Sequence, residues 1–178
     1  EEACPLDLAP TTSTTAALAL GDALAVALLE AKNFKSDDFA KSHPGGKLGK
    51  RLITTVDDLM SKGEALPIVT KETSLSETLI EISSKGLGVA LVVNKNKLLG
   101  IFTDGDLRRT LNNEKDPLDK DIQSFMTQKS KTIQKDCLAI EALEIMQNNS
   151  IYSLAVLDNK HAPVGVIRMH DLIEAGLV

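Results

Sequence analysis

The chain has 178 residues, of which 43% are hydrophobic and 25% are charged, enough for one sound core of domain size. With 20 basic against 25 acidic residues its formal net charge is −5, which disfavours nucleic acid and anionic membrane surfaces as partners. The three histidines and two cysteines show no metal-ligand spacing, so we expect no metal and no cofactor.

An Ala- and Leu-rich segment, residues 16–31, comes first, and the threonines at 11–15 are candidate helix caps. A helix that is apolar on all sides must be buried on all sides, and nothing else in this part of the chain is apolar enough to cover it. We expect its partner to be the same helix of a second subunit or the body of a missing domain, and hence a homo-oligomer, dimer or tetramer. Its shortness and Asp22 near its middle disfavour a membrane span.

The segment 42–46 reads Ser-His-Pro-Gly-Gly and is followed by cations at positions 47, 50 and 51. Pro44 biases His43 toward an extended backbone, and the two glycines permit a tight turn. This arrangement would hold the imidazole at a loop tip beside positive charge, which suits an anionic substrate. Taken alone, the pattern is more often an ordinary surface turn.

The remainder contains two copies of one pattern at an offset of 65 residues, because Gly100 and Asp106 recur as Gly165 and Asp171. Each copy predicts a strand, a helix, two strands and a closing helix. In the first copy we expect these at 66–70, from the Ser74–Glu77 capping box onward, at 89–93, at 98–102 and from 104; in the second at 131–133, around 138–146, at 151–157, at 164–168 and at 169–175. Such small units cannot bury their sheets alone, so the copies should pack face to face as a pseudo-twofold pair.

From about residue 56 to the end, this order and the G-I-x-T-x-x-D-L sequence at the close of the first copy resemble a pair of CBS (cystathionine-β-synthase-type) domains. The resemblance implies an α/β (α+β) fold with a tandem pair of pseudo-twofold symmetry, and nucleotide sensing. The Thr103 hydroxyl at a strand end and Asp106 in the following turn suit a phosphate and a ribose diol. In the second copy Arg168 replaces the threonine and His170 precedes Asp171, so this site would hold an anionic group by charge.

Each of these residues also has an ordinary structural interpretation. Thr103 and Asp106 would equally well cap the closing helix. For Asp171 capping is the favoured interpretation, and Arg168 at a strand end would usually be solvated or ion-paired.

Residues 4–17, 21–25 and 42–46 closely resemble the end of the sugar isomerase (SIS) domain in bacterial D-arabinose 5-phosphate isomerases, where two CBS domains follow directly. This resemblance implies an SIS remnant with linker at 1–54, a first CBS domain at 55–118 and a second at 119–178. It implies a C-terminal piece of a cytoplasmic enzyme that interconverts D-ribulose 5-phosphate and D-arabinose 5-phosphate, the first step of Kdo and lipopolysaccharide biosynthesis. His43 would be a catalytic residue, acting in ring opening or in proton transfer. Because the phosphate loop and the catalytic Lys and Glu of that family lie upstream, we expect this piece alone to be inactive.

The resemblance also implies a ligand. The pathway ends in CMP-Kdo, so we expect this molecule, or failing it another nucleotide, to bind between the copies, with Thr103 and Asp106 on the nucleotide and Arg168 and His170 on the sugar carboxylate. Two alternatives remain open. One is a stand-alone nucleotide-binding or oligomerisation module, and the other is an isomerase paralogue of capsule or sugar-alcohol metabolism.

Overall fold

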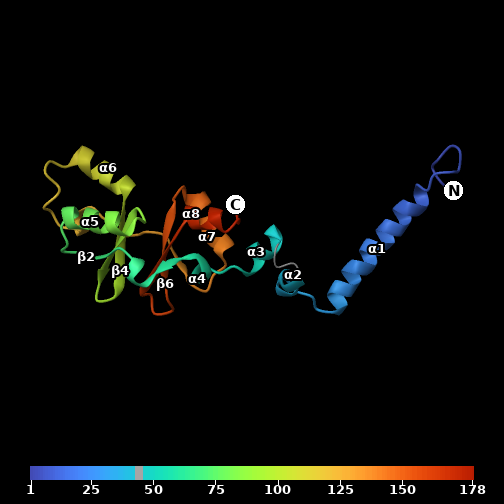
Figure 1. Cartoon of the computed structure of the whole chain (residues 1–178), viewed down its shortest axis with the longest axis horizontal. Helices are drawn as coiled ribbons and strands as arrows, with labels where there is room; N and C mark the ends of the chain where they lie inside the picture. Colours follow the sequence, from blue (N-terminus) through green and yellow to red (C-terminus); the bar gives the residue numbers. More distant parts are fainter. Residues whose placement is uncertain (43–45) are drawn as a thin grey trace. The chain divides into compact units, whose positions relative to one another are not determined.

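The structure, a computed structural model, describes residues 1–42 and 46–178, and for residues 37, 40, 41 and 47 the backbone alone. It divides into two compact units, Glu1–Pro44 and Gly45–Val178, each of which is described by itself (Figure 1).

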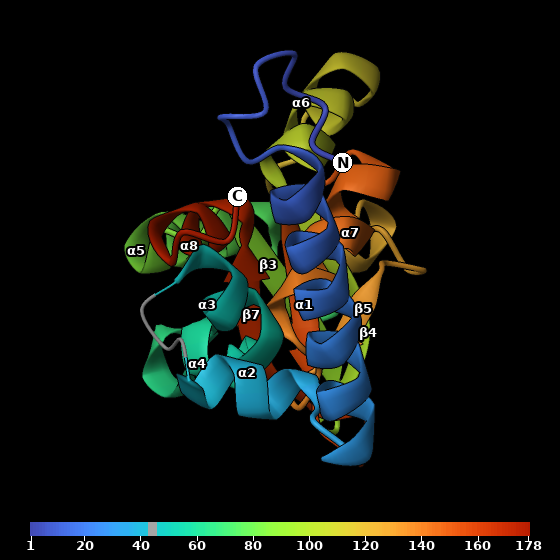
Figure 2. The ribbon, with the colours of Figure 1, turned by 90° about the vertical axis from the view of Figure 1, so that its right-hand side faces the viewer.

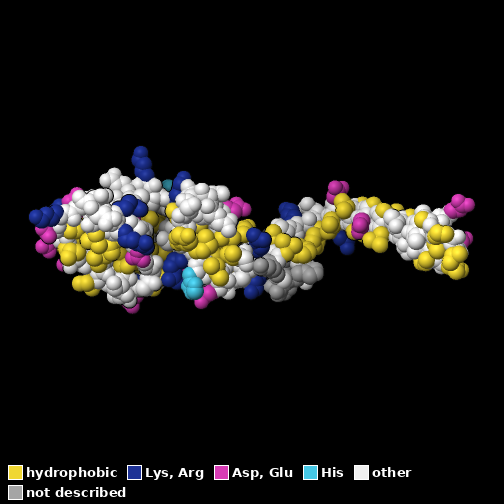
Figure 3. All heavy atoms as spheres, turned by 90° about the horizontal axis from the view of Figure 1, so that it is seen from above, with side chains coloured by type: hydrophobic (Ala, Val, Ile, Leu, Met, Phe, Trp, Pro, Cys, Tyr) yellow, Lys and Arg dark blue, Asp and Glu magenta, His cyan; other side chains and the backbone are white. Residues whose placement is uncertain are grey.

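The first unit contains helix α1 (Thr12–Ala31) and the short helix α2 (Ser36–Ser42). The predicted apolar helix is present and begins four residues earlier than expected, after Thr11. The side-chain hydrogen bond with Ser13 and the backbone N–H of Thr11, which donates to the Glu2 carboxylate at 2.7 Å, lower the pKa of Glu2 to about 2. All residues of α1 are exposed within the chain, and Figure 3 shows the hydrophobic side chains in yellow along this helix.

The second unit opens with three short elements and then runs through both copies of the repeat. The opening elements are α3 (Lys47–Ile53), α4 (Val56–Leu59) and the two-residue strand β1 (Ser61–Lys62), followed by a 3-10 turn, η1 (Gly63–Ala65). The first copy has β2 (Ile68–Thr70), α5 (Leu75–Lys85), β3 (Val89–Asn94), β4 (Lys97–Thr103) and α6 (Asp104–Asn113). After the 3-10 turn η2 (Ile122–Ser124), the second copy has β5 (Thr132–Gln134), α7 (Ala139–Asn149), β6 (Ser153–Leu157), β7 (Pro163–Arg168) and α8 (Met169–Glu174).

Each copy forms the same small sheet, in which the first strand runs parallel to the second and the second antiparallel to the third. The order is β2-β3-β4 in one sheet and β5-β6-β7 in the other, with β1 added beside β7. Figure 2 labels β3 and β4 of the first sheet and β5 and β7 of the second. Helix α5 packs on β2 and β3, and α7 packs on β6. The predicted order of elements in both copies, and thus the mixed α/β fold with two similar units, is confirmed.

Local chemistry sets the ends of the first repeat helix. The Ser74 hydroxyl accepts from the backbone N–H of Glu77 at 3.2 Å, and the Glu77 carboxylate accepts from the backbone N–H of Ser74 at 3.2 Å, so the predicted capping box is formed. Gly86 then ends the helix at φ +68°, a left-handed conformation that glycine adopts without a Cβ clash. Gly86 thereby directs the chain toward β3. The carbonyl oxygen of the same residue contacts the second copy.

The segment in front of each copy crosses to the other copy's sheet. Strand β1, ahead of β2, pairs antiparallel with β7, and Thr127, ahead of β5, exchanges two backbone hydrogen bonds of 2.8 and 3.1 Å with Ile101 of β4. The recurring glycines lie at these crossings. A Cβ on Gly100 would meet the Thr127 carbonyl oxygen at 2.5 Å, and one on Gly165 would meet the Met60 sulfur. The repeated glycine therefore marks close backbone approach.

The two sheets share one of the three hydrophobic clusters of the second unit. This cluster unites side chains of the first copy with Ala155 and Val166 of the second, and its buried members from the first copy are Leu66, Val89 and Leu91. Because neither sheet covers this face alone, the copies depend on each other for burial. The expected face-to-face packing is confirmed.

Candidate ligand site at the ends of the two repeats

Thr103 and Asp106 form a capping box at the start of α6. The Asp106 carboxylate accepts from the backbone N–H of Thr103 at 2.9 Å and from its hydroxyl at 2.6 Å, and the Thr103 oxygen accepts from the backbone N–H of Asp106 at 3.4 Å. Asp106 is 6% exposed, one of only three buried polar residues in the described part of the chain. The capping interpretation of this pair is thus realised in the structure.

The second carboxylate oxygen of Asp106 joins two further side chains. Thr127, from the segment ahead of the second copy, donates its hydroxyl at 3.0 Å, and Arg109 donates a guanidinium N–H at 2.5 Å. The Arg109 side chain is 69% exposed, so it is the partner that a ligand hydroxyl can replace at the lowest cost. Asp106 therefore keeps one oxygen for the cap and presents the other at the contact between the copies.

Arg168 takes the corresponding place before α8. Its guanidinium forms a forked pair with Asp171, with Nε–Oδ2 and Nη2–Oδ1 distances of 3.2 and 2.7 Å, and this hydrogen-bonded pair raises the pKa of Arg168 above its usual value. The Asp171 carboxylate also accepts the backbone N–H of Arg168 at 2.9 Å. The ion-paired interpretation of Arg168 and the capping interpretation of Asp171 both hold. Two of the five guanidinium N–H groups have no partner in the described part of the chain.

One turn of the first copy connects the two end motifs. Arg168 Nη1 donates to the carbonyl oxygen of Gly86 at 3.3 Å, and a Cβ on Gly88 would lie 3.3 Å from the Asp104 carboxylate. Gly86 and Gly88 both have positive φ, +68° and +67°. The turn at Gly86 and Gly88 thus lies beside both Arg168 of the second copy and Asp104 of the first copy's closing helix.

His170 takes no part in this arrangement. The His170 side chain is 64% exposed and pairs with Glu174 one helical turn away at 3.2 Å. His43 lies outside the described residues. Among the described residues no group of three or more His, Cys, Asp or Glu side chains could hold a metal ion.

The sequence comparison decides the family. The pattern of the family described as CBS domain matches this chain twice, at residues 56–113 and 120–177. The chain belongs to the CBS-domain family. The end motifs described above therefore close the first and second domains of a CBS pair.

Curated relatives share more than the CBS pair. The arabinose 5-phosphate isomerase KdsD of Pseudomonas aeruginosa is 53% identical over 179 residues, covering 100% of this chain and 55% of the relative. The proteins of the same name from Francisella tularensis and Escherichia coli are 53% and 48% identical, over 99% and 100% of this chain and 54% of each relative. The chain thus spans about half the length of the curated relatives it matches.

Solved CBS pairs have the same fold. The CBS domain pair of protein MJ0100, in complex with 5-methylthioadenosine and S-adenosyl-L-methionine, has a TM-score of 0.62 at 24% identity, over 68% of this chain and 94% of that one. CBSX2 in complex with AMP has a TM-score of 0.59 at 20% identity, over 70% and 96%. At these identities the likeness shows the fold alone.

Sequence reasoning missed three contacts of the CBS pair. These are the Arg109 and Thr127 bonds to Asp106 and the Gly86 carbonyl that receives Arg168. Arg109 was open to discovery, because a cation three residues after a capping aspartate lies on the same helix face. Thr127 and Gly86 depend on the crossing of the leading segments, for which the residue pattern gives no direct signal.

Proposed function

We propose that this chain is the regulatory CBS pair, with the end of the sugar isomerase domain, of an arabinose 5-phosphate isomerase. The carrying observation is the 53% identity to KdsD over the whole chain, including residues ahead of the CBS matches. That coverage favours the isomerase over a stand-alone module. The parent would interconvert D-ribulose 5-phosphate and D-arabinose 5-phosphate, in the cytoplasm and ahead of Kdo and lipopolysaccharide synthesis. A paralogue in capsule or sugar-alcohol metabolism is the alternative, and the KdsD name of the relatives favours the lipopolysaccharide enzyme.

In this proposal the boundaries are 1–54 for the isomerase remnant and linker, and 55–118 and 119–178 for the CBS domains. His43 would be the catalytic residue of the parent, and the 178-residue chain alone should not isomerise arabinose 5-phosphate. Replacing His43→Ala in the parent should lower kcat/KM by about 10²–10⁴-fold, the usual contribution of a general acid or base. Full activity in that variant would reduce His43 to a turn residue.

Helix α1 fits a protein environment better than a lipid one. By length and composition it is able to cross a membrane, with 20 residues and a mean hydropathy of 1.5. However, Asp22 near its centre would cost about 2.5–3.5 kcal/mol in a bilayer. We propose that α1 is covered by the isomerase domain or by a second subunit. Coverage by a second subunit would make the protein a homo-oligomer.

The same proposal assigns the CBS pair a regulatory ligand, CMP-Kdo or failing it another nucleotide. Thr103 and Asp106 would take the ribose and phosphate, with a ribose hydroxyl replacing the exposed Arg109 at Asp106. Arg168 would use its two spare N–H groups for the sugar carboxylate, assisted by His170, while Asp171 holds the guanidinium in place. Support comes from the geometry of the two end motifs around the Gly86 turn.

Calorimetric titration of the chain with CMP-Kdo, CMP, AMP and ATP tests this assignment. Arg168→Ala should weaken CMP-Kdo binding by about 1.5–3 kcal/mol, the usual contribution of a charge-assisted hydrogen bond, and leave CMP nearly unchanged. Arg108→Ala, an exposed arginine on α6, is the matched control. No heat from any of the four compounds at millimolar concentration would exclude a sensor, and equal affinity for AMP and CMP-Kdo would exclude the end product.

A further inference from the structure

A cavity lies at the start of β4, at the opposite end of this strand from the end motifs. The cavity has a volume of about 350 Å³, is open to solvent on one side, and is lined by the start of β4, the segment joining the copies, β5, the end of β6 and the turn between β6 and β7. Lys97, which lines it, and Thr103 are the first and last residues of β4, so about 20 Å of strand separates it from the candidate nucleotide site. Its volume lies within the range of small-molecule sites, about 300–1,000 Å³.

Positive charge gathers at this cavity in a chain that is acidic as a whole. Its lining includes Lys97, Lys160 and His161 and no aspartate or glutamate. None of these three forms an ion pair with a carboxylate in the described part of the chain. Asp158, in the same turn but outside the lining, carries one opposing charge: its carboxylate accepts the backbone N–H groups of Ala162 and Lys160 at 2.8 and 2.9 Å, and these bonds, with the nearby charge of Lys160, lower its pKa.

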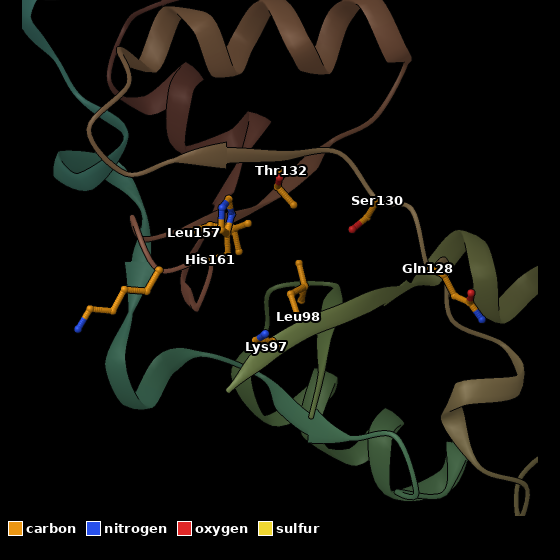
Figure 4. Close-up of a pocket in the computed structure, with 8 residues that line it drawn as sticks. Lys97, Leu98, Gln128, Ser130, Thr132, Leu157 and His161 are labelled. Atoms are coloured by element: carbon orange, nitrogen blue, oxygen red, sulfur yellow. The ribbon is translucent and has the colours of Figure 1, made fainter. Parts of the chain in front are cut away.

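The neutral part of the lining is rich in hydrogen-bonding groups without protein partners. Gln128, Ser130 and Thr132 contribute an amide and two hydroxyls, and none of these side chains makes a hydrogen bond to another described residue. Leu98 and Leu157 supply an apolar floor. Figure 4 shows Leu98 on the first copy's side of the opening and Leu157, His161 and Thr132 on the second copy's side, with Ser130 on the segment that joins the copies.

The backbone holds His161 in an uncommon conformation, with φ +61°. The corresponding turn of the first copy has Asn96 at φ +64°, so this geometry belongs to the turn. Asn96 is the residue type that such a position favours, whereas the second copy places an imidazole there, in the lining of the cavity. The turn geometry therefore explains the positive φ of His161 but not why the residue is a histidine. We attribute the histidine to its place in the lining of the cavity.

We propose that this cavity binds a sugar-sized phosphate monoester. The two lysines match the charge of a phosphate group, and the imidazole, amide and hydroxyls can form hydrogen bonds with a sugar phosphate. No phenylalanine, tyrosine or tryptophan lines the cavity. Because both copies and the joining segment form its walls, the bound ligand would hold the CBS pair together from the end opposite the candidate nucleotide site.

Nuclear magnetic resonance titration of the 178-residue chain locates and measures this binding. D-ribose 5-phosphate should shift backbone amides at residues 97–98, 128–132 and 157–161 and leave residues 103–106 and 168–171 nearly unmoved. The double variant Lys97→Gln, Lys160→Gln should weaken Kd by on the order of 25-fold, about fivefold for each exposed ion pair that is lost. The matched control Lys95→Gln, Lys115→Gln removes the same charge outside the lining and should keep the affinity. His161→Asn, which tolerates the left-handed turn, should weaken binding without changing the fold.

Four outcomes would overturn the assignment. They are an absence of binding at 10 mM ligand, about the weakest affinity a specific small-molecule site would show, amide shifts centred on residues 103–106 or 168–171, equal affinity for inorganic phosphate or for unphosphorylated ribose, and an unchanged Kd in the double variant. Circular dichroism of each variant separates lost binding from lost folding.

Discussion

Alanine in place of Gly100 should weaken the contact that ties the second CBS domain to the first. The added Cβ would lie 2.5 Å from the Thr127 carbonyl oxygen and 3.1 Å from both the Thr127 carbonyl carbon and the Gln128 Cα. These are backbone atoms, so the strain can be relieved only if the joining segment moves away from β4. Overpacking of this kind costs about 1–3 kcal/mol, and at about 2–4 °C per kcal/mol it should lower Tm by roughly 2–12 °C.

Two other glycines provide graded controls in the same unit. At Gly165 the tightest neighbour is the Met60 thioether, a flexible side chain that can rotate, so Gly165→Ala should cost less than Gly100→Ala. At Gly105, inside α6, the nearest side-chain atoms lie at 3.6 and 3.7 Å, and alanine should be neutral or stabilising by about 0.5–1 kcal/mol. Thermal unfolding measures all three, and amide exchange at Thr127 reports the loss of its bonds to Ile101. A Gly100→Ala protein as stable as Gly105→Ala would refute the close-approach argument.

Three further predictions concern acid stability, assembly and the buried carboxylate. The Thr55 hydroxyl and N–H keep the pKa of Asp58 below its usual value; this contribution is present above about pH 4 and is lost as pH falls through the folded-state pKa. Thr55→Ala should therefore cost about 0.5–2 kcal/mol in urea unfolding at pH 7 and less in acid. Light scattering should show that the 178-residue chain is a dimer or larger, and Leu24→Glu on exposed α1 should weaken this association. A monomer at micromolar concentration, without the substitution, would contradict the prediction. Asp106→Asn should cost about 1–3 kcal/mol by denaturant unfolding, more than Arg109→Ala at its exposed partner; the reverse order would show that the carboxylate is not the centre of this network.

Much of the fold followed from the sequence because the repeat states its pattern twice. The continuously apolar run at 89–93 became β3, and the Ser74 capping box became the start of α5. The predicted ends of the strands were less accurate, because hydrogen bonds of the neighbouring helical turns take up the first residues of the predicted strands. Leu66, expected in a strand, closes the 3-10 turn through its N–H to Gly63, and Ile151 closes α7 through its N–H to Met146. The crossing of the leading segments was not predictable, since every sheet edge offers the same N–H and C=O groups.

The candidate site followed from the sequence in its residues but less so in its contacts. Thr103 and Asp106 were recognised with both a capping and a ligand-binding interpretation, and the structure realises the cap. Ligand contact by these residues, and by Arg168 and His170, stays a prediction. The partners of Asp106 and Arg168 in the other copy could not be predicted, because they depend on how the copies are paired.

Those partners bear on the proposed regulatory role of the end motifs. Two of the candidate ligand-binding side chains already bond to the neighbouring CBS domain, Asp106 to the leading segment through Thr127 and Arg168 to the carbonyl of Gly86. In the proposed complex a ribose hydroxyl would replace Arg109 at the Asp106 oxygen that Thr127 also contacts, and a carboxylate would bind the spare N–H groups of the guanidinium that contacts Gly86. The ligand would therefore bind side chains that contacts between the two domains hold in place, so its affinity would depend on the relative position of the domains. A ligand shifts a conformational equilibrium only by such a difference in affinity, and under this proposal the difference would arise at Asp106 and Arg168.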